Sequence, residues 1–298
     1  MSKYFRQFTS KEEHDKASSL IATIDQGEEW IFNGCDGSDE FGGFLNQLYF
    51  ESGDTYGTFL ACVFRNNLRI QIGFNNDMPE ILEDELLNLI QNARNKVNTF
   101  TSIWYVATNQ KLEEFIYNKL PWKVKGHKTH ELKAFREDFS DIEVIFPRDI
   151  VIIPFEEKYI EEVCDMLDKS MAHTYDEPDV KEYSCGAQKF CVEWSMKAKK
   201  NECCLMLLHE NVAGIYILNG AELDILAMDV KLQNKGWGSV LLKHALKHIF
   251  ETSEDIPYLY CVENNKNALR FYLREGMKET AYSGYAYCEH MDEFTIIQ

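Results

Sequence analysis

Residues 228–239 read Met-Asp-Val-Lys-Leu-Gln-Asn-Lys-Gly-Trp-Gly-Ser. An apolar run leads into this stretch, and an amphipathic run over 240–249 leads out of it. Gly236 and Gly238 therefore lie where a strand turns into a helix. The N–H groups and dipole of a helix start favour an anion, and glycine lets a phosphate approach without a Cβ in the way. The stretch predicts a phosphate cradle.

The glycine pattern alone is also typical of a simple tight turn. It is not a Walker loop, because Gly-x-x-x-x-Gly-Lys-Ser/Thr is absent from the chain. A Rossmann fingerprint is excluded as well, since the third glycine is missing and this strand comes late in the chain. The residues downstream of the loop favour the cradle over the turn.

Residues 258–277 predict a short strand, an Asn-rich turn that caps a helix, the helix itself and a glycine stop. Here the chain resembles the GNAT superfamily of acyl-CoA N-acyltransferases. The first hallmark of that family is Gln/Arg-x-x-Gly-x-Gly/Ala after the fourth strand, and the second is Asn-x-x-Ala-x-x-x-Tyr-x-x-x-Gly-Phe. The residues that match them are Gln233, Gly236 and Gly238, then Asn265, Ala268, Tyr272 and Gly276, with Met277 in place of the Phe.

The resemblance covers roughly residues 149–298 and implies an α/β (α+β) fold, with a mixed, mostly antiparallel central sheet flanked by helices. It also implies acetyl-CoA as cosubstrate. The expected contacts come from the end of the fourth strand, the glycine loop and the helix of the second hallmark. They are Met228, Asp229, Val230, Gln233, Asn234, Lys235, Gly236, Trp237, Gly238, Ser239, Asn265, Ala268 and Tyr272.

Acetyl transfer to an amine needs an acid for the leaving thiolate and a base for the amine. The resemblance implies that Tyr272 is the acid, whereas a packed helix tyrosine is the alternative. Glu222 lies eleven residues before Gln233, which matches the catalytic glutamate of the histone-acetyltransferase branch. Asp224, two residues later, is expected on the same strand face. Both are candidate bases; as alternatives they bind substrate or face solvent, and water chains carry the proton.

We expect direct transfer in a ternary complex, since no cysteine lies in a recognisable nucleophile context. The acceptor is a primary amine of a small molecule or peptide, and polyamine, aminoglycoside, amino acid and protein N-terminus all remain open. The resemblance places acceptor-recognition helices around His173, Tyr175, Tyr183 and Trp194. The competing interpretation is a non-catalytic acyl-CoA sensor or interaction protein, and a third is a peptide-binding scaffold without a cofactor.

An internal repeat predicts two domains, 1–146 and 147–298. Shifting the second half back by 155 positions places Asn264 on Asn109 and aligns the preceding strands without a gap. The glycine loop then falls on 78–84, Met-Pro-Glu-Ile-Leu-Glu-Asp, which has no glycine and three acidic residues. Carboxylates at a helix start repel a phosphate, and proline removes an N–H donor. The first domain is expected to be a degenerate copy that acts as a scaffold.

The chain has 298 residues, with 49 acidic and 31 basic side chains and a formal net charge of −18. Such a charge disfavours nucleic acid as a partner and attracts cations, or it only keeps the protein in solution. No apolar stretch is long enough for a membrane span and no signal peptide is evident, so we expect a cytoplasmic protein with its nine cysteines reduced. His244 and His248 have a metal-pair spacing, but no third ligand is obvious and no metal is expected.

Overall fold

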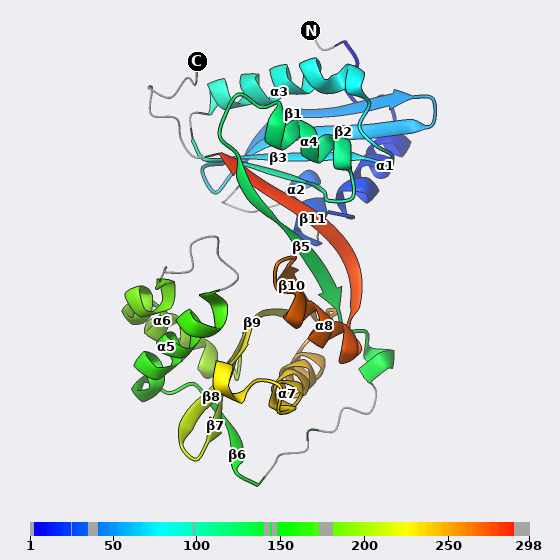
Figure 1. Ribbon diagram of the computed structural model, residues 1–298. Helices are drawn as coiled ribbons and strands as arrows, with labels where there is room; N and C mark the ends of the chain where they lie inside the picture. Colours follow the sequence, from blue (N-terminus) through cyan, green and yellow to red (C-terminus); the bar gives the residue numbers. More distant parts are fainter. Residues whose placement is uncertain are drawn as a thin grey trace. The chain divides into compact units, whose positions relative to one another are not determined.

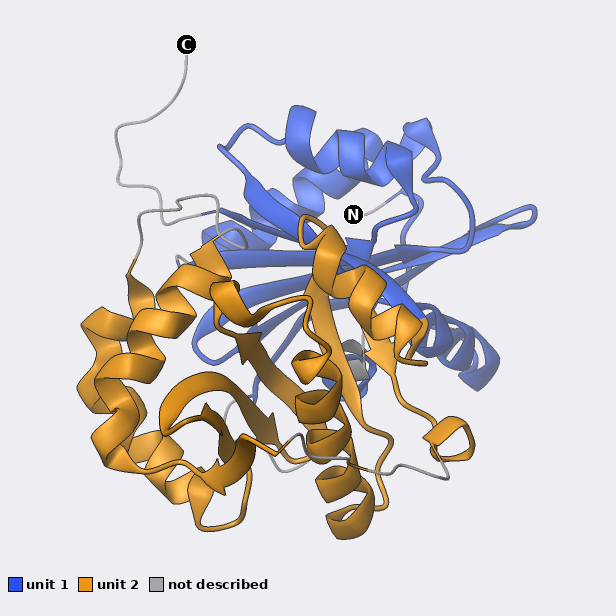
Figure 2. Ribbon diagram, turned by 60° about the horizontal axis from the view of Figure 1, so that its bottom comes forward, with its two compact units in different colours: residues 1–130, 280–298 blue, residues 131–279 orange. Residues whose placement is uncertain are grey.

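The computed structural model describes residues 3–24, 26–34, 41–97, 99–139, 144, 148–172 and 181–288. The chain divides into two compact units (Figure 2). Unit 1 comprises residues 1–130 and 280–298, and unit 2 comprises residues 131–279. Each unit is a sheet with helices on both faces.

The sheet of unit 1 has the strand order β1-β2-β3-β4-β11-β5 (Figure 1). β1, β2 and β3 pair antiparallel in succession, β3 and β4 pair in parallel, and β11 pairs antiparallel with β4. The sheet is therefore mixed and mostly antiparallel. The strands are β1 (Phe41–Ser52), β2 (Thr55–Phe64), β3 (Asn67–Phe74), β4 (Thr101–Val106), β5 (Lys125–Lys133) and β11 (Lys278–Cys288).

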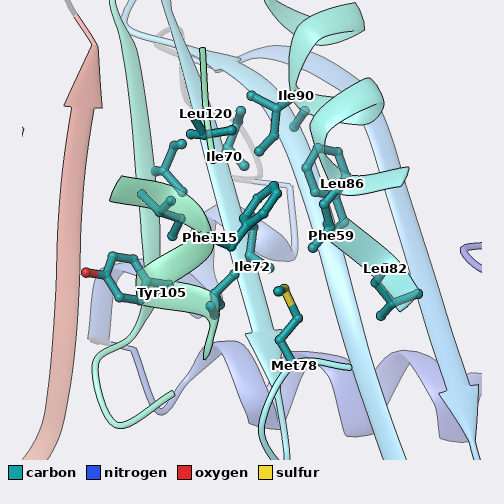
Figure 3. Packing of buried hydrophobic residues seen from close by; sticks show 14 of the residues in the cluster. Phe59, Ile70, Ile72, Met78, Leu82, Leu86, Ile90, Tyr105, Phe115 and Leu120 are labelled. Atoms are coloured by element: carbon teal, nitrogen blue, oxygen red, sulfur yellow. The ribbon is translucent and has the colours of Figure 1, made fainter. Parts of the chain in front are cut away.

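Two separate apolar layers pack against this sheet. On one face α3 and α4 bury Leu86, Ile90 and Phe115 against Ile70 and Ile72 of β3 (Figure 3). On the other face α1 and α2 cover β1 and β2. The helices are α1 (Lys11–Ile21), α2 (Gln26–Phe32), α3 (Glu83–Lys96) and α4 (Gln110–Asn118).

The sheet of unit 2 has the order β10-β9-β8-β7-β6, with the last residues of β5 beside β10. All neighbours from β6 to β9 are antiparallel, and β9 and β10 are parallel. The strands are β6 (Ile150–Pro154), β7 (Cys203–Leu208), β8 (Asn211–Asn219), β9 (Glu222–Met228) and β10 (Tyr258–Val262).

Helices also cover both faces of the unit 2 sheet (Figure 1). α7 and α8 pack on one face through Leu241, Ala245 and Tyr272. α5 and α6 pack on the other through Val163 and Trp194. The helices are α5 (Ile160–Met171), α6 (Glu182–Ala198), α7 (Trp237–Thr252) and α8 (Lys266–Arg274). The two units together confirm the expected fold class.

The division of the chain differs from the expected 1–146 and 147–298. β5 and β11 each run from one unit into the other, so that the chain after Thr280 belongs to unit 1. The reason is strand pairing: Ser283–Cys288 of β11 pair with Thr101–Val106 of β4. The C-terminal strand therefore completes the sheet of the first copy.

The repeat is visible as a common order of elements, strand–helix–strand–helix, in β3-α3-β4-α4 and β9-α7-β10-α8. Both last helices begin at an asparagine whose side chain accepts from the N–H three residues on, Asn109 from Leu112 at 3.0 Å and Asn265 from Ala268 at 3.2 Å. Asn109 therefore corresponds to Asn265, not to Asn264. The gap-free alignment is wrong by one residue at this helix.

In the described part of the chain, no helix has both the length and the apolar character needed to cross a bilayer. Eight of the nine cysteines lie in the described ranges, and all eight are free thiols.

Candidate functional site

The parallel strands β9 and β10 diverge after their first residues. Their paired positions in the described chain are Glu222 and Tyr258, and the N–H of Tyr258 donates to the carbonyl of Ala221 at 3.1 Å. The corresponding strands of unit 1 behave differently, because Leu68–Ile72 of β3 pair continuously with Thr101–Tyr105 of β4. The backbone edge of β9 that faces β10 is thus available in unit 2 and closed in unit 1.

The end of β9 directs main-chain groups toward this divergent edge. The N–H of Asp229 donates to the carbonyl of Ala213 on β8 at 2.9 Å. Because successive residues of a strand point their N–H groups to opposite sides, the N–H groups of Leu226 and Met228 are directed away from β8. The carbonyl of Met228 accepts from Nε2 of Gln233 at 3.3 Å. Main-chain groups of β9 that face away from β8 can therefore form hydrogen bonds to an extended ligand.

A short 3₁₀ turn, η5 (Val230–Leu232), joins β9 to the glycine loop. The Asp229 side chain accepts from the N–H of Lys231 at 2.7 Å and so caps this turn, and Val230 is exposed. Asn234 has φ +61° and Gly236 has φ +83°, both in the left-handed region. A Cβ added at Gly236 would meet nothing within 4 Å. The space beside the loop is open, as a phosphate site requires.

The first turn of α7 has the properties of an anion site. Gly236 is its N-cap, no side chain caps its N–H groups, and the turn contains no acidic residue. A Cβ at Gly238 would lie 3.6 Å from Phe271 of α8 and 3.8 Å from Met228 of β9. Gly238 therefore packs the start of α7 against both elements. Lys235 adds positive charge and lies 5.5 Å from the ring centroid of Trp237.

Ser239 has a partner that the sequence pattern does not predict. Its Oγ donates to Oε1 of Glu275 at 2.7 Å, and the Glu275 side chain is 13% exposed. Arg274 Nη2 lies 3.1 Å from the same oxygen. The hydroxyl of Ser239 is directed at a carboxylate in this structure. A glutamate just after a helix end resembles an ordinary surface residue in the sequence, so the sequence did not indicate that Glu275 lies at the site.

Tyr272 is buried, with 8% of its surface exposed, in the core between α8 and the sheet. Burial raises the pKa of its hydroxyl far above the ordinary value, and negative charge on Cys261 would raise it further. In the described part of the chain no hydrogen bond to the Tyr272 hydroxyl is found. The side chain is therefore both a core residue and a neutral donor at neutral pH.

Asn265 and Ala268 belong to the start of α8. The side chain of Asn265 is occupied as the helix cap, and Ala268 supplies the N–H that it accepts. Ala268 also packs against the apolar core with Phe271. These two residues fix the position of the helix that carries Tyr272, and their own contacts with a cofactor stay a prediction.

The expectation that Glu222 and Asp224 lie on the same face of the strand assumed strict alternation of side chains. That alternation is interrupted here. Leu218 pairs with Leu223 and Ile217 with Ile225, so Asp224 is an extra residue, a β-bulge. Leu223 consequently packs toward α7, whereas Ile225 packs toward α5 and α6. Leu223 and Ile225, on either side of Asp224, therefore pack on opposite faces of the sheet.

Asp224 keeps much of its side chain in solvent, yet the surrounding protein desolvates the carboxylate enough to raise its pKa. Lys197 of α6 opposes the shift and Glu193 of α6 adds to it. The Lys197 ammonium donates to the carbonyl of Leu218 at 2.7 Å. Glu222 is half-buried at the start of β9.

The expected acceptor residues divide into two groups. His173 and Tyr175 lie outside the described residues. Trp194 is 2% exposed and stacks on Phe190 at 5.2 Å, and Tyr183 is 7% exposed in the same core. Both side chains pack the helices α5 and α6 onto the sheet, so the structure gives them a core position.

His244 on α7 is half-buried, with Nδ1 3.1 Å from the hydroxyl of Tyr216. Burial lowers the pKa of His244, and His248 and Lys247 lower it further. Within the described ranges, no group of three or more His, Cys, Asp or Glu side chains is arranged to hold a metal ion.

The counterpart loop of unit 1 is filled by protein. Met78 and Leu82 are buried in the core of unit 1 (Figure 3), and the N–H of Met78 donates to Asn109 at 3.2 Å. Glu80 forms an ion pair with Lys111 at 3.0 Å, which lowers the pKa of Glu80. A carboxylate and its cation lie where the other copy has its glycine loop.

Comparison with known proteins gives a match to a family model over part of the chain, and a fold. Residues 161–277 match the model of the acetyltransferase (GNAT) family. No curated protein sequence matches the chain significantly.

Several solved structures share the fold. The chain is 12% identical to a GCN5-related N-acetyltransferase from Sphaerobacter thermophilus, with 92% of each chain covered and a TM-score of 0.53. A conserved protein of unknown function from Staphylococcus epidermidis is 14% identical, with 75% and 85% of the two chains covered and a TM-score of 0.52. A Drosophila protein is 12% identical over 96% and 98%, with a TM-score of 0.51. At such identities the likeness is one of fold.

Proposed function

We propose that the chain, whose residues 161–277 match the model of the GNAT acetyltransferase family, is an acetyl-CoA-dependent N-acetyltransferase. The observation that carries the proposal is the divergence of β9 from β10 beside an uncapped helix start. A main-chain edge for a pantetheine arm and a diphosphate site at α7 then lie next to each other. The acceptor is a primary amine, and its identity stays open.

The residues present fit the coenzyme at both ends. Gly236, Trp237 and Gly238 would place main-chain N–H groups around the diphosphate, with Lys235 adding charge. The edge of β9 at Met228 would hold the pantetheine arm. The bound coenzyme would supply an acetyl thioester, which is the activated acyl group of the reaction.

Three groups of the chain carry the transfer. The N–H of Met228 stabilises the negative charge that develops on the thioester oxygen. Glu222 or Asp224, directly or through water, takes the proton of the acceptor amine. The amine nitrogen forms the new C–N bond as the C–S bond breaks, and Tyr272 donates its proton to the departing sulfur.

The proposal is tested on the full-length chain by calorimetry with CoA, followed by thiol release from acetyl-CoA in the presence of a panel of amines. Binding with a Kd in the micromolar range, which corresponds to roughly 8 kcal/mol, is expected. Amine-dependent thiol release supports the enzyme. Binding without any amine-dependent release would instead support a non-catalytic acyl-CoA sensor, and absence of binding would overturn both.

The base is identified by the acid limb of the pH–rate profile. A general base acts only when deprotonated, so kcat/KM rises with pH through its pKa. If Glu222 is the base, Glu222→Gln removes this limb. If Asp224 is the base, Asp224→Asn removes it, and the limb of the unsubstituted protein lies above the usual Asp range because the pKa of Asp224 is raised. Glu254→Gln, at an exposed residue after α7, is the control. An unchanged limb in both variants would assign proton removal to water.

We expect one coenzyme per chain, bound by unit 2. In unit 1 the strands β3 and β4 pair along their length, and Glu80 with Lys111 occupies the loop position. Calorimetry should therefore give a stoichiometry of one, and Gly236→Val should abolish all binding, not half of it. Titration to two equivalents, of which one persists in that variant, would show a second site near residues 74–84.

A further inference from the structure

Glu275 brings a negative charge to the start of α7 from outside that helix. It follows the last residue of α8 and lies three residues after Tyr272. Its Oε1 accepts from the hydroxyl of Ser239, the third residue of α7, at 2.7 Å. Its side chain is mostly buried, at 13% exposure. The first turn of α7 has no acidic residue of its own, so Glu275 is the carboxylate hydrogen-bonded there.

This contact opposes the binding of a diphosphate in two ways. A carboxylate beside the first turn of a helix occupies part of the favourable potential that would attract another anion. In addition, a serine hydroxyl has one hydrogen to donate, and Ser239 directs it to Glu275 instead of into the open space beside Gly236.

Glu275 also has a second partner beside it. Arg274 Nη2 and Nε lie 3.1 Å and 3.3 Å from the same Oε1. The Arg274 side chain is 69% exposed, and its guanidinium lies over the ring of Phe271, 5.5 Å from the ring centroid. If Ser239 turns toward a ligand, Arg274 still satisfies the Glu275 carboxylate. The exchange of partners therefore leaves no buried charge unpaired.

We propose that Glu275 sets the affinity of the chain for the diphosphate of its coenzyme, by holding the Ser239 hydroxyl and by charge repulsion. The inference rests on the proposed function, which places the diphosphate at the start of α7. Diphosphate binding requires Ser239 to exchange Glu275 for a phosphate oxygen, and Glu275 keeps Arg274. Glu275 is a positioning residue that weakens coenzyme binding and so favours release of the CoA product.

The test compares CoA with acetyl-pantetheine, which has the thioester but lacks the diphosphate. Glu275→Gln keeps the shape and removes the charge, and we expect it to tighten CoA binding about three- to tenfold by calorimetry. The KM for acetyl-pantetheine should stay within about twofold, because Glu275 acts at the diphosphate. Glu254→Gln makes the same change in net charge at an exposed residue after α7 and should alter neither value.

A double-mutant cycle isolates the hydroxyl. With Glu275 present, Ser239→Ala should change CoA affinity less than about twofold, since the hydroxyl is already engaged. In a Glu275→Ala background the hydroxyl can reach the phosphate, and Ser239→Ala should then weaken binding about tenfold. Thermal melts confirm that each variant is folded.

The outcomes separate the two proposals. Failure of the unsubstituted chain to bind CoA would overturn the proposed function and this inference with it. Normal CoA binding together with an unchanged affinity in Glu275→Gln would overturn this inference alone. An equal gain for CoA and acetyl-pantetheine would also overturn it, because a general effect on α8 would then be the cause.

Discussion

Gly236→Val is expected to abolish CoA binding, with a loss of at least about 100-fold in affinity, equivalent to about 2.8 kcal/mol. The residue is the N-cap of α7 at φ +83°, and its missing Cβ would project into open space beside the first-turn N–H groups. A valine there puts Cβ and its two methyl groups where the diphosphate would lie. Calorimetry with the full-length variant measures the loss.

The control must separate this effect from backbone strain, because a β-branched residue at positive φ is strained wherever it stands. Gly53, in the turn between β1 and β2, has φ +61° and also has nothing within 4 Å of an added Cβ. Gly53→Val should lower thermal stability by a comparable amount and leave CoA affinity unchanged. A folded Gly236→Val protein that binds CoA as the parent does would refute the cradle assignment.

The glycine loop could be predicted from the sequence because its determinants are local. A left-handed N-cap requires glycine at Gly236, and the amphipathic run after it requires a helix. The asparagine cap of α8 was readable for the same reason, since Asn265 accepts from an N–H three residues away. Structural features that depend on residues close together in the sequence can be predicted from the sequence.

The course of β11 could not be predicted in this way. Its mixture of small and aromatic residues, 281–288, suits any half-buried strand, and nothing in it identifies β4 as the partner. The divergence of β9 from β10 could not be predicted either, because it depends on how two strands far apart in the sequence meet. The domain boundary was therefore placed in chain order, whereas the structure gives the last strand to the first copy.

Two details of the site depend on single residues whose role only the folded chain reveals. The bulge at Asp224 changes which face of the sheet its neighbours occupy. An expectation based on the two-residue period of a strand cannot detect one inserted residue. Glu275 reaches Ser239 across 36 residues of sequence. The family resemblance implied Ser239 as a cofactor contact, but its present partner is the Glu275 carboxylate, which was not among the expected site residues.

Tyr272→Phe is expected to lower kcat by about 10²–10⁴-fold while CoA affinity is nearly retained. The phenol is the candidate proton donor to the leaving thiolate, and phenylalanine keeps the ring that packs in the core of unit 2. Burial raises the pKa of Tyr272, so the hydroxyl stays protonated well above neutral pH. Because the acid acts only when protonated, Tyr272 should cause no fall in kcat between about pH 7 and 9, where unperturbed tyrosines are still mostly neutral.

Steady-state kinetics with acetyl-CoA and the best amine of the panel measures this effect, and calorimetry measures the affinity. Tyr159→Phe, at a half-buried tyrosine in η3 (Glu157–Tyr159) of the same unit, removes a hydroxyl without touching α8 and should keep the parental kcat. A kcat within twofold of the parent in Tyr272→Phe would leave Tyr272 a packing residue. Water would then have to protonate the sulfur.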